Sequence, residues 1–180
     1  MRVVAMAMLA AVLLPVDRVG AAIDRSFEGD RHLRFEVEDR SYATESPGDA
    51  IVWPEAFTLE AWVRLTTASP YGLIAGRPMA ERGQDPFYHV ALAFEGPDGR
   101  TPALIASTGV AGTYRVAAAS SAIDVQRWVH VAGVRDVAGT LRVYVDGVLA
   151  GTSQSVGAVS PNPGMRFSIG GGMRGDGLEH

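Results

Sequence analysis

The chain of 180 residues has no cysteine and no lysine. Without cysteine it can form no disulfide, thiol nucleophile or cysteine-ligated metal site, so its stability must come from burial. Without lysine it has no Schiff-base chemistry, and its 16 basic residues are arginines scattered along the sequence without a basic run. The 20 acidic residues give a formal net charge of −4. We therefore expect no nucleic-acid partner.

No apolar run reaches the roughly 20 residues that a membrane-spanning helix needs, so we expect no transmembrane segment. The longest run, Val3 to Val16, follows Arg2 and precedes Val19-Gly20-Ala21, whose small residues suit a signal-peptidase site. We expect residues 1–21 to be a signal peptide and the protein to be secreted or extracytoplasmic. The alternative is an apolar segment that is retained and packs on the domain.

Convincing amphipathic helices are also missing, because apolar residues recur at every second position, the period of a half-buried strand. The clearest stretch is 127–151, which contains two alternating strands. Asp136–Thr140 forms the turn between them, and Asp146-Gly147 after the second strand suits a type I′ hairpin turn.

Further strands are predicted from alternation or from flanking turns, and polar stretches rich in glycine and proline are predicted as loops. The additional strand candidates are 33–37, 57–65, 73–74, 87–94, 103–107, 114–119 and 166–170, and the longest loops are 39–54 and 76–86. The length allows one domain with a proper core. The pattern therefore predicts an all-β antiparallel sandwich or barrel.

Three segments resemble the laminin G-like family of the concanavalin A-like lectin/glucanase superfamily. They are FTLEAWVR at 57–64, WVHVAGV at 128–134 and GTLRVYVDG at 139–147. The resemblance covers about residues 30–177, so we assign the domain to 22–177. It implies a concanavalin A-like jelly roll, in which two antiparallel sheets pack face to face.

The chain departs from the family at both ends. Members commonly open with a strand like F-D-G-x-D-D-Y-V, whereas residues 34–40 read RFEVEDR, and they close with G-x-I-D-E-V-R-I, of which only a lead-in at 169–172 is found. Leu178-Glu179-His180 resembles a vector-derived tail ahead of a histidine tag. We therefore expect a sandwich that lacks its closing strand and exposes an unpaired edge.

The faces opposite the aliphatic residues carry a mixture that suits a glycan or an extracellular protein ligand. Sugar rings stack on flat aromatics while their hydroxyls bond to polar side chains. The candidate ligand-binding residues are Glu60, Trp62, Arg64, His89, His130, Arg142 and Tyr144. The structural alternatives are that Trp62 and Tyr144 pack beneath a loop or inside a second small core, and that His130 is a hydrogen-bonded residue of the sheet with no role in binding.

We predict a secreted, non-catalytic binding module that is part of a larger protein. The alternatives are a polysaccharide-degrading glycoside hydrolase or lyase, and a cell-adhesion or assembly module. Hydrolysis needs two carboxylates on one side of a strand, and among the stretches with strand alternation only Glu36 and Glu38 have that spacing. Their interpretation as a solvated polar face is favoured, and no nucleophile motif accompanies the four histidines, so we assign no catalytic residues.

Calcium is the one cofactor that the resemblance implies, because members of the family often hold it at a rim. Acids of the opening loop and of the closing strand supply the oxygen ligands there. The oxygen ligands available in this chain are Glu38, Asp39 and Asp49, although the family motif that would fix them is altered at its opening and absent at its close.

The expected unpaired edge predicts self-association by dimerisation or strand exchange, because exposed backbone N–H and C=O groups pair readily with a second chain. Light scattering at high protein concentration checks this expectation. A monodisperse monomer would contradict it.

Overall fold

The computed structural model describes residues 43–44, 53–68, 70, 72–78, 88–108, 114–154, 157–159, 167–170, 172–174 and 177–179. All regular structure in this part of the chain is β, and all strand neighbours are antiparallel. Across the described residues no helix is long and apolar enough to cross a membrane. The predicted signal peptide lies outside them.

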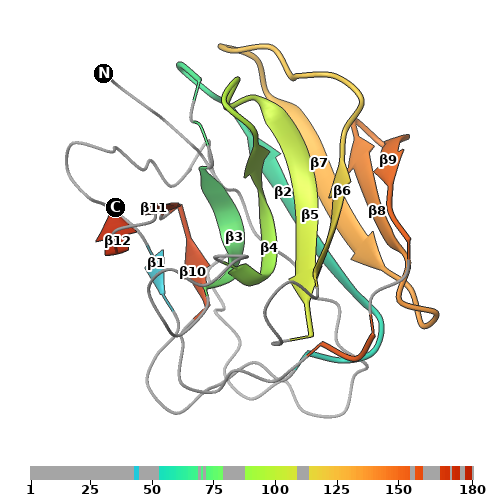
Figure 1. Cartoon of the computed structure of the whole chain (residues 1–180). Coiled ribbons are helices and arrows are strands. Elements are labelled where there is room, and N and C mark those ends of the chain that lie inside the picture. Colours follow the sequence, from blue (N-terminus) through green and yellow to red (C-terminus); the bar gives the residue numbers. More distant parts are fainter. Residues whose placement is uncertain are drawn as a thin grey trace, which may run out of the picture.

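The strands form two main sheets that face each other (Figure 1). The six-stranded sheet has the order β1 (Ala43–Thr44), β10 (Ser168–Ile169), β3 (Leu73–Pro78), β4 (Tyr88–Glu95), β5 (Thr101–Ser107) and β6 (Tyr114–Ala118). The four-stranded sheet has the order β2 (Phe57–Val63), β7 (Val129–Arg135), β8 (Leu141–Val145) and β9 (Val148–Thr152). The short strands β11 (Gly172–Arg174) and β12 (Gly177–Glu179) pair with each other. The predicted sandwich of two antiparallel sheets is confirmed.

The main core lies between the two sheets. Strand β2 shows how the sequence builds it, because Phe57, Leu59, Ala61 and Val63 are buried while the residues between them are partly exposed or exposed. The fully buried large aliphatic and aromatic side chains are Leu59, Val63, Leu65, Ile74, Val90, Leu92, Phe94, Leu104, Val131, Leu141 and Val143. Each such side chain contributes about 1.5–3 kcal/mol by leaving water, which drives the sheets together.

The middle of the six-stranded sheet is buried on both faces. Val90, Leu92 and Phe94 of β4 belong to the main core, whereas Ala91 and Ala93 of the same strand belong to a second apolar cluster with Leu73 and Ile105. Strand β5 is buried from Pro102 to Ser107. A strand buried on both faces needs no polar alternation, which explains why the alanine-rich segment 103–107 folds as a strand.

Two stretches predicted as loops contain strand residues. Ala43 and Thr44 lie in the predicted loop 39–54, yet they pair with Ile169 and Ser168, because a two-residue bridge uses only backbone groups and needs no apolar pattern. Strand β3 extends through Gly76, which opened the predicted loop 76–86. Only glycine fits at this position of the strand, because a Cβ there would lie 2.5 Å from the carbonyl oxygen of Val90. The strand predicted at 33–37 lies outside the described residues.

The two sheets meet where β9, at one edge, approaches β6 of the other sheet. The Ser120 N–H donates to the Ala150 carbonyl at 2.9 Å. A Cβ on Gly151 would lie 1.9 Å from the Ala118 carbonyl oxygen. Only glycine allows this approach of two backbones, so Gly151 joins the sheets at this edge.

The turn between β8 and β9 has the predicted type I′ geometry. Asp146 has a φ of 49° and Gly147 a φ of 79°, the positive values that this turn requires at both central residues. The sequence pattern names two strands in 127–151, and the structure adds a third, β9. Its residues Val148 and Leu149 are exposed, so β9 shows no alternation that could predict it.

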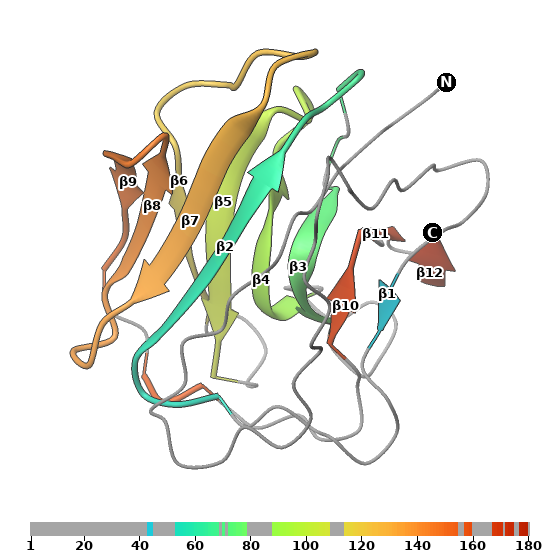
Figure 2. The ribbon, with the colours of Figure 1, turned by 180° about the vertical axis from the view of Figure 1, so that it is seen from behind.

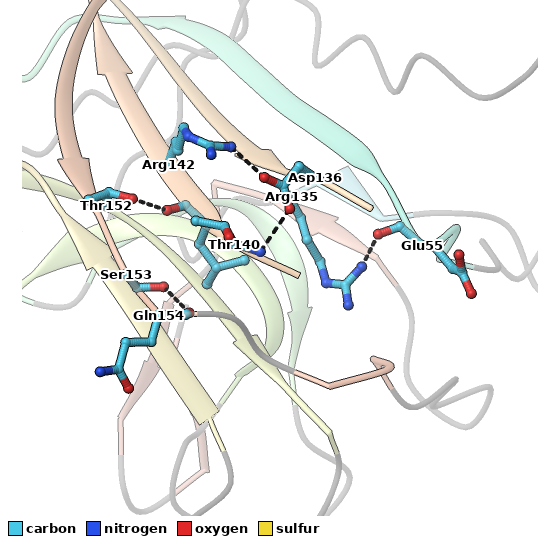
Figure 3. Close-up of polar contacts among 9 residues, drawn as sticks. Glu55, Arg135, Asp136, Thr140, Arg142, Thr152, Ser153 and Gln154 are labelled. Atoms are coloured by element: carbon cyan, nitrogen blue, oxygen red, sulfur yellow. Dashed lines mark hydrogen bonds and ion pairs between the residues drawn. The ribbon is translucent and has the colours of Figure 1, made fainter. Parts of the chain in front are cut away.

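The turn between β7 and β8 is fixed by Asp136 (Figure 3). One oxygen of its carboxylate accepts the Thr140 N–H at 2.9 Å, and the other pairs with an Arg142 guanidinium nitrogen at 2.7 Å. The hydrogen bond from Arg142 is the main cause that lowers the pKa of Asp136. Gly139 completes the turn with a φ of 84°.

Arg135, the last residue of β7, is buried and ties two loops to the end of the sandwich. Its guanidinium donates to the Glu55 carbonyl and, at 3.0 Å, to the Gly157 carbonyl. Figure 3 shows the bond to Glu55 beside the Asp136 turn. A buried arginine is stabilising only when such acceptors surround it, so this side chain has a structural role.

Replacing Gly151 with alanine is expected to destabilise the protein more than replacing Gly147 with alanine. At Gly151 the new Cβ would meet backbone atoms at 1.9 Å, so a strand must move, whereas at Gly147 nothing lies within 4 Å and only the positive φ opposes it. We expect about 1–2 kcal/mol for Gly147→Ala and a larger loss for Gly151→Ala. Urea unfolding of both variants checks this, and equal losses would contradict the close approach.

Replacing Asp136 with asparagine is expected to destabilise the protein at neutral pH but not at low pH. Folding lowers the pKa of this carboxyl, so its stabilising effect is complete above the ordinary value of 3.8 and is lost as the pH falls through the lowered value. Asparagine keeps the acceptor for Thr140 and removes the charge opposite Arg142. Urea unfolding across the acid range checks this, and a pH-independent difference from the natural protein would refute it.

Candidate functional site

The candidate site is the outer face of the four-stranded sheet, which Figure 2 shows in front of the other sheet. Because side chains alternate along a strand, residues opposite the core set share this face. Trp62 lies across from His130 in the pairing of β2 with β7. In the next row, Ala132 separates Glu60 on β2 from Tyr144 on β8.

Five of the seven predicted ligand-binding residues lie on this one face. They are Glu60, Trp62, His130, Arg142 and Tyr144. The sheet register brings them together, since strands that are distant in sequence are neighbours here. We call these five residues the outer-face set.

Trp62 is the most exposed aromatic residue of the outer-face set, with 47% of its surface accessible. Its ring and that of His130 have centroids 5.3 Å apart and are tilted by 52°. The alternative that Trp62 packs beneath a loop is therefore wrong. Tyr144 is half-buried between its strand neighbours. The face thus offers one open aromatic surface and a second, partly covered ring.

His130 lies between an acid and an aromatic ring. Its Nε2 is 3.6 Å from an oxygen of Glu60, a distance at which the two form an ion pair when the imidazole is protonated. Its main-chain N–H donates to the Asp146 carboxylate at 2.9 Å. The backbone of His130 thus serves the turn, while its side chain remains on the outer face.

Arg64, just after the end of β2, supports the neighbouring loop. Its Nε donates to the Gln126 carbonyl at 3.3 Å and another guanidinium nitrogen donates to the Gln126 side-chain oxygen at 3.1 Å. Gln126 has a φ of 63°, and its side chain in turn donates to the Thr66 carbonyl. Arg64 therefore holds a strained turn beside the face, which the alternation of β2 could not predict.

Arg127 follows Gln126 at the edge of the outer face, and the sequence pattern did not indicate it. Its guanidinium pairs with the carboxylate of Asp146, and Asp124 lies 4.0 Å from it. Asp146 is the predicted turn former, but its carboxylate also accepts the His130 N–H. No local signal in the sequence points to Arg127, because its contact with Asp146 joins residues 19 apart in the chain.

His89 belongs to another sheet. It lies on β4 of the six-stranded sheet, so its strand does not contribute to the face that carries Trp62. Glu95, at the end of the same strand, is half-buried, and burial raises its pKa. The shared alternation of β2 and β4 therefore does not mean a shared surface.

The predicted metal ligands Glu38, Asp39 and Asp49 lie outside the described residues, and so do Glu36 and Glu38 as the acid pair. Among the residues that the structure describes, no group of three histidine, aspartate or glutamate side chains could hold a metal ion. Calcium binding remains a prediction.

The acidic residues near the outer face bear on whether it could hydrolyse a glycosidic bond. Strands β2, β7, β8 and β9 are described completely, and Glu60 is their one acidic residue. Glycoside hydrolysis requires two carboxyl groups that flank the scissile bond, roughly 5–10 Å apart. Asp136 and Asp146 lie in turns, where each is paired with an arginine. The face therefore combines one acceptor carboxylate, donors and an open ring.

Comparison with known sequences identifies the family of the chain. No curated protein matches it. The profile of the family described as the concanavalin A-like lectin/glucanases superfamily, a laminin G type, matches residues 34–178, which is most of the chain. The two packed antiparallel sheets agree with that match. The chain belongs to the laminin G-like family of the concanavalin A-like lectin/glucanase superfamily.

Proposed function

We propose that this domain is a non-catalytic binding module that holds carbohydrate against the outer face of its four-stranded sheet. The observation that carries the proposal is the exposure of Trp62, 47% of whose surface is accessible on a regular strand. A large aromatic side chain in water costs free energy, so an exposed tryptophan beside polar groups is typical of a binding surface.

The groups around Trp62 complement the apolar face and the hydroxyls of a sugar. The apolar face of a pyranose ring can lie on the indole, while its hydroxyls both donate and accept hydrogen bonds. Glu60 supplies acceptor oxygens, Arg142 supplies donors, and Tyr144 can do both. These residues come from β2 and β8, with β7 between them. The register of three strands thus supports one continuous surface for a ligand.

We further propose that the domain acts outside the cytoplasm. The support is the sequence of residues 1–21, where an apolar run precedes small residues that suit signal-peptidase cleavage. Carbohydrate chains are abundant targets in that location. Detection of the mature protein in the medium or periplasm, with its N-terminus determined by sequencing, tests this placement.

Replacing Trp62 with alanine is expected to weaken carbohydrate binding by about tenfold or more, since a loss of roughly 1.4 kcal/mol corresponds to that factor. The ligand would first be found on a glycan array and then titrated by calorimetry. We expect the stability of the variant to change by less than about 1 kcal/mol, because the side chain is half-exposed.

The matched control is Val137→Ser, which changes an apolar side chain that is 78% exposed in the turn between β7 and β8. It removes exposed apolar surface from a residue outside the outer-face set, while the neighbouring Asp136 keeps its bond to Arg142, and should leave binding unchanged. Equal binding by the natural protein and the Trp62 variant would rule out the proposed face. Release of reducing sugar from a bound polysaccharide would show instead that the module is catalytic.

A further inference from the structure

The charged groups around the outer-face set carry no net positive charge. Arg142 pairs with Asp136 at 2.7 Å, and Arg127 pairs with Asp146. Arg64, just past the end of β2, is bonded to Gln126, and Glu60 of β2 lies beside His130. Asp124 lies 4.0 Å from Arg127, so these described residues comprise three arginines and four carboxylates. An anionic ligand therefore finds no excess of positive charge on this surface.

Hydrogen-bonding capacity nevertheless remains. A guanidinium has several N–H donors, and the contact with Asp136 engages one nitrogen of Arg142. The Glu60 carboxylate has more acceptor positions than its contact with His130 occupies. A hydroxyl can use these groups without disturbing an ion pair. At Arg142 or Arg127, a sulfate or carboxylate would have to displace the existing carboxylate to form the bidentate contact that it prefers.

The two aromatic residues are too far apart for one sugar. Trp62 and Tyr144 lie two strands and one row of paired residues apart. With neighbouring strands about 4.8 Å apart and about 3.3 Å per residue along a strand, their Cα atoms are about 12 Å from each other. Ala132, a buried residue with a single methyl group as its side chain, lies between Glu60 and Tyr144. A single pyranose ring does not span that distance.

We propose that the ligand of the outer face is an uncharged oligosaccharide that runs diagonally across β2, β7 and β8 from Trp62 to Tyr144. This inference rests on the proposed function and specifies its ligand class. Neutral hydroxyls satisfy the remaining donors and acceptors, and an extended chain reaches both rings. Anionic glycans such as oligouronates and sulfated fragments are disfavoured, because Arg142 and Arg127 are already paired with carboxylates and the acids around the face outnumber the arginines.

The first test compares neutral gluco-, manno- and xylo-oligosaccharides of increasing length with oligouronates and heparin fragments, using the natural protein. We expect a neutral series to bind, with affinity that rises from the monosaccharide to the longer members and changes little between low and high NaCl, because an uncharged ligand is not screened. If the monosaccharide binds as tightly as the longer members, the proposed path from Trp62 to Tyr144 is wrong. Preference for the anionic fragments overturns the charge argument.

The second test releases one arginine from its partner. Asp136→Asn keeps the acceptor for Thr140 but leaves the Arg142 charge uncompensated. We expect binding of heparin fragments at low salt to rise by about threefold or more, and the gain to disappear at high salt. Glu60→Gln, which removes the acid beside Trp62, provides an independent variant with the same expected direction if Asp136→Asn folds poorly.

The matched control is Asp98→Asn, which makes the same change of charge in the loop between β4 and β5 of the other sheet. The Asp98 carboxylate accepts the Thr101 hydroxyl and the main-chain N–H of Arg100, and its sheet is not the one that carries the outer-face set. An equal gain of anion binding in this control would mean that net charge, not the released arginine, is responsible. That outcome would overturn the inference.

The Trp62→Ala variant distinguishes an error in the ligand class from an error in the proposed function. If the natural protein prefers anionic glycans and Trp62→Ala abolishes that binding, the face binds carbohydrate and only the ligand class is wrong. If no glycan on the array depends on Trp62, the proposed function itself fails.

Discussion

The pairing of β2 with β7 is the constraint on which the candidate site depends. In this register Leu59, Ala61 and Val63 point into the core, and Glu60 and Trp62 point out. Side chains alternate with a period of two, so a slip of one residue would exchange the two sets and place a carboxylate in the apolar interior. The free energy gained by the core therefore also fixes the composition of the outer face. No loop has to fold to place Trp62 beside His130.

The turns do more than connect strands. Asp146 supplies the positive φ of the type I′ turn, accepts the His130 N–H and pairs with Arg127. This one residue therefore links β7, the turn between β8 and β9, and Arg127. Asp136 has the same combination of turn and ion pair at the other end of β8. Since both carboxylates already hold arginines, the turn chemistry sets the electrostatic character of the surface between them.

Sequence alone predicted most of the strands, because alternation and turn residues are local signals. It placed β2, β7 and β8 and the Asp146-Gly147 turn correctly, and it selected five residues that lie together. It could not separate His89 from Trp62, because a period of two tells which residues share a face of one strand but not which sheet that strand joins. The bridge of Ala43 and Thr44 and the exposed strand β9 left no apolar pattern. The bonds of Arg64 to Gln126 depend on a contact between distant segments, which composition does not reveal.

The two sheets differ in how many substitutions they can tolerate. The central strands of the six-stranded sheet are buried on both faces, where alanine, isoleucine and leucine fill the available space. Almost any substitution in β4 or β5 changes packing, which limits how fast these strands can diverge. In strands β2, β7 and β8, alternate side chains form the core, and the side chains between them lie on the outer face, where they can vary more freely. A lineage that keeps this scaffold can therefore acquire a new specificity by exchanging a few side chains on the four-stranded sheet.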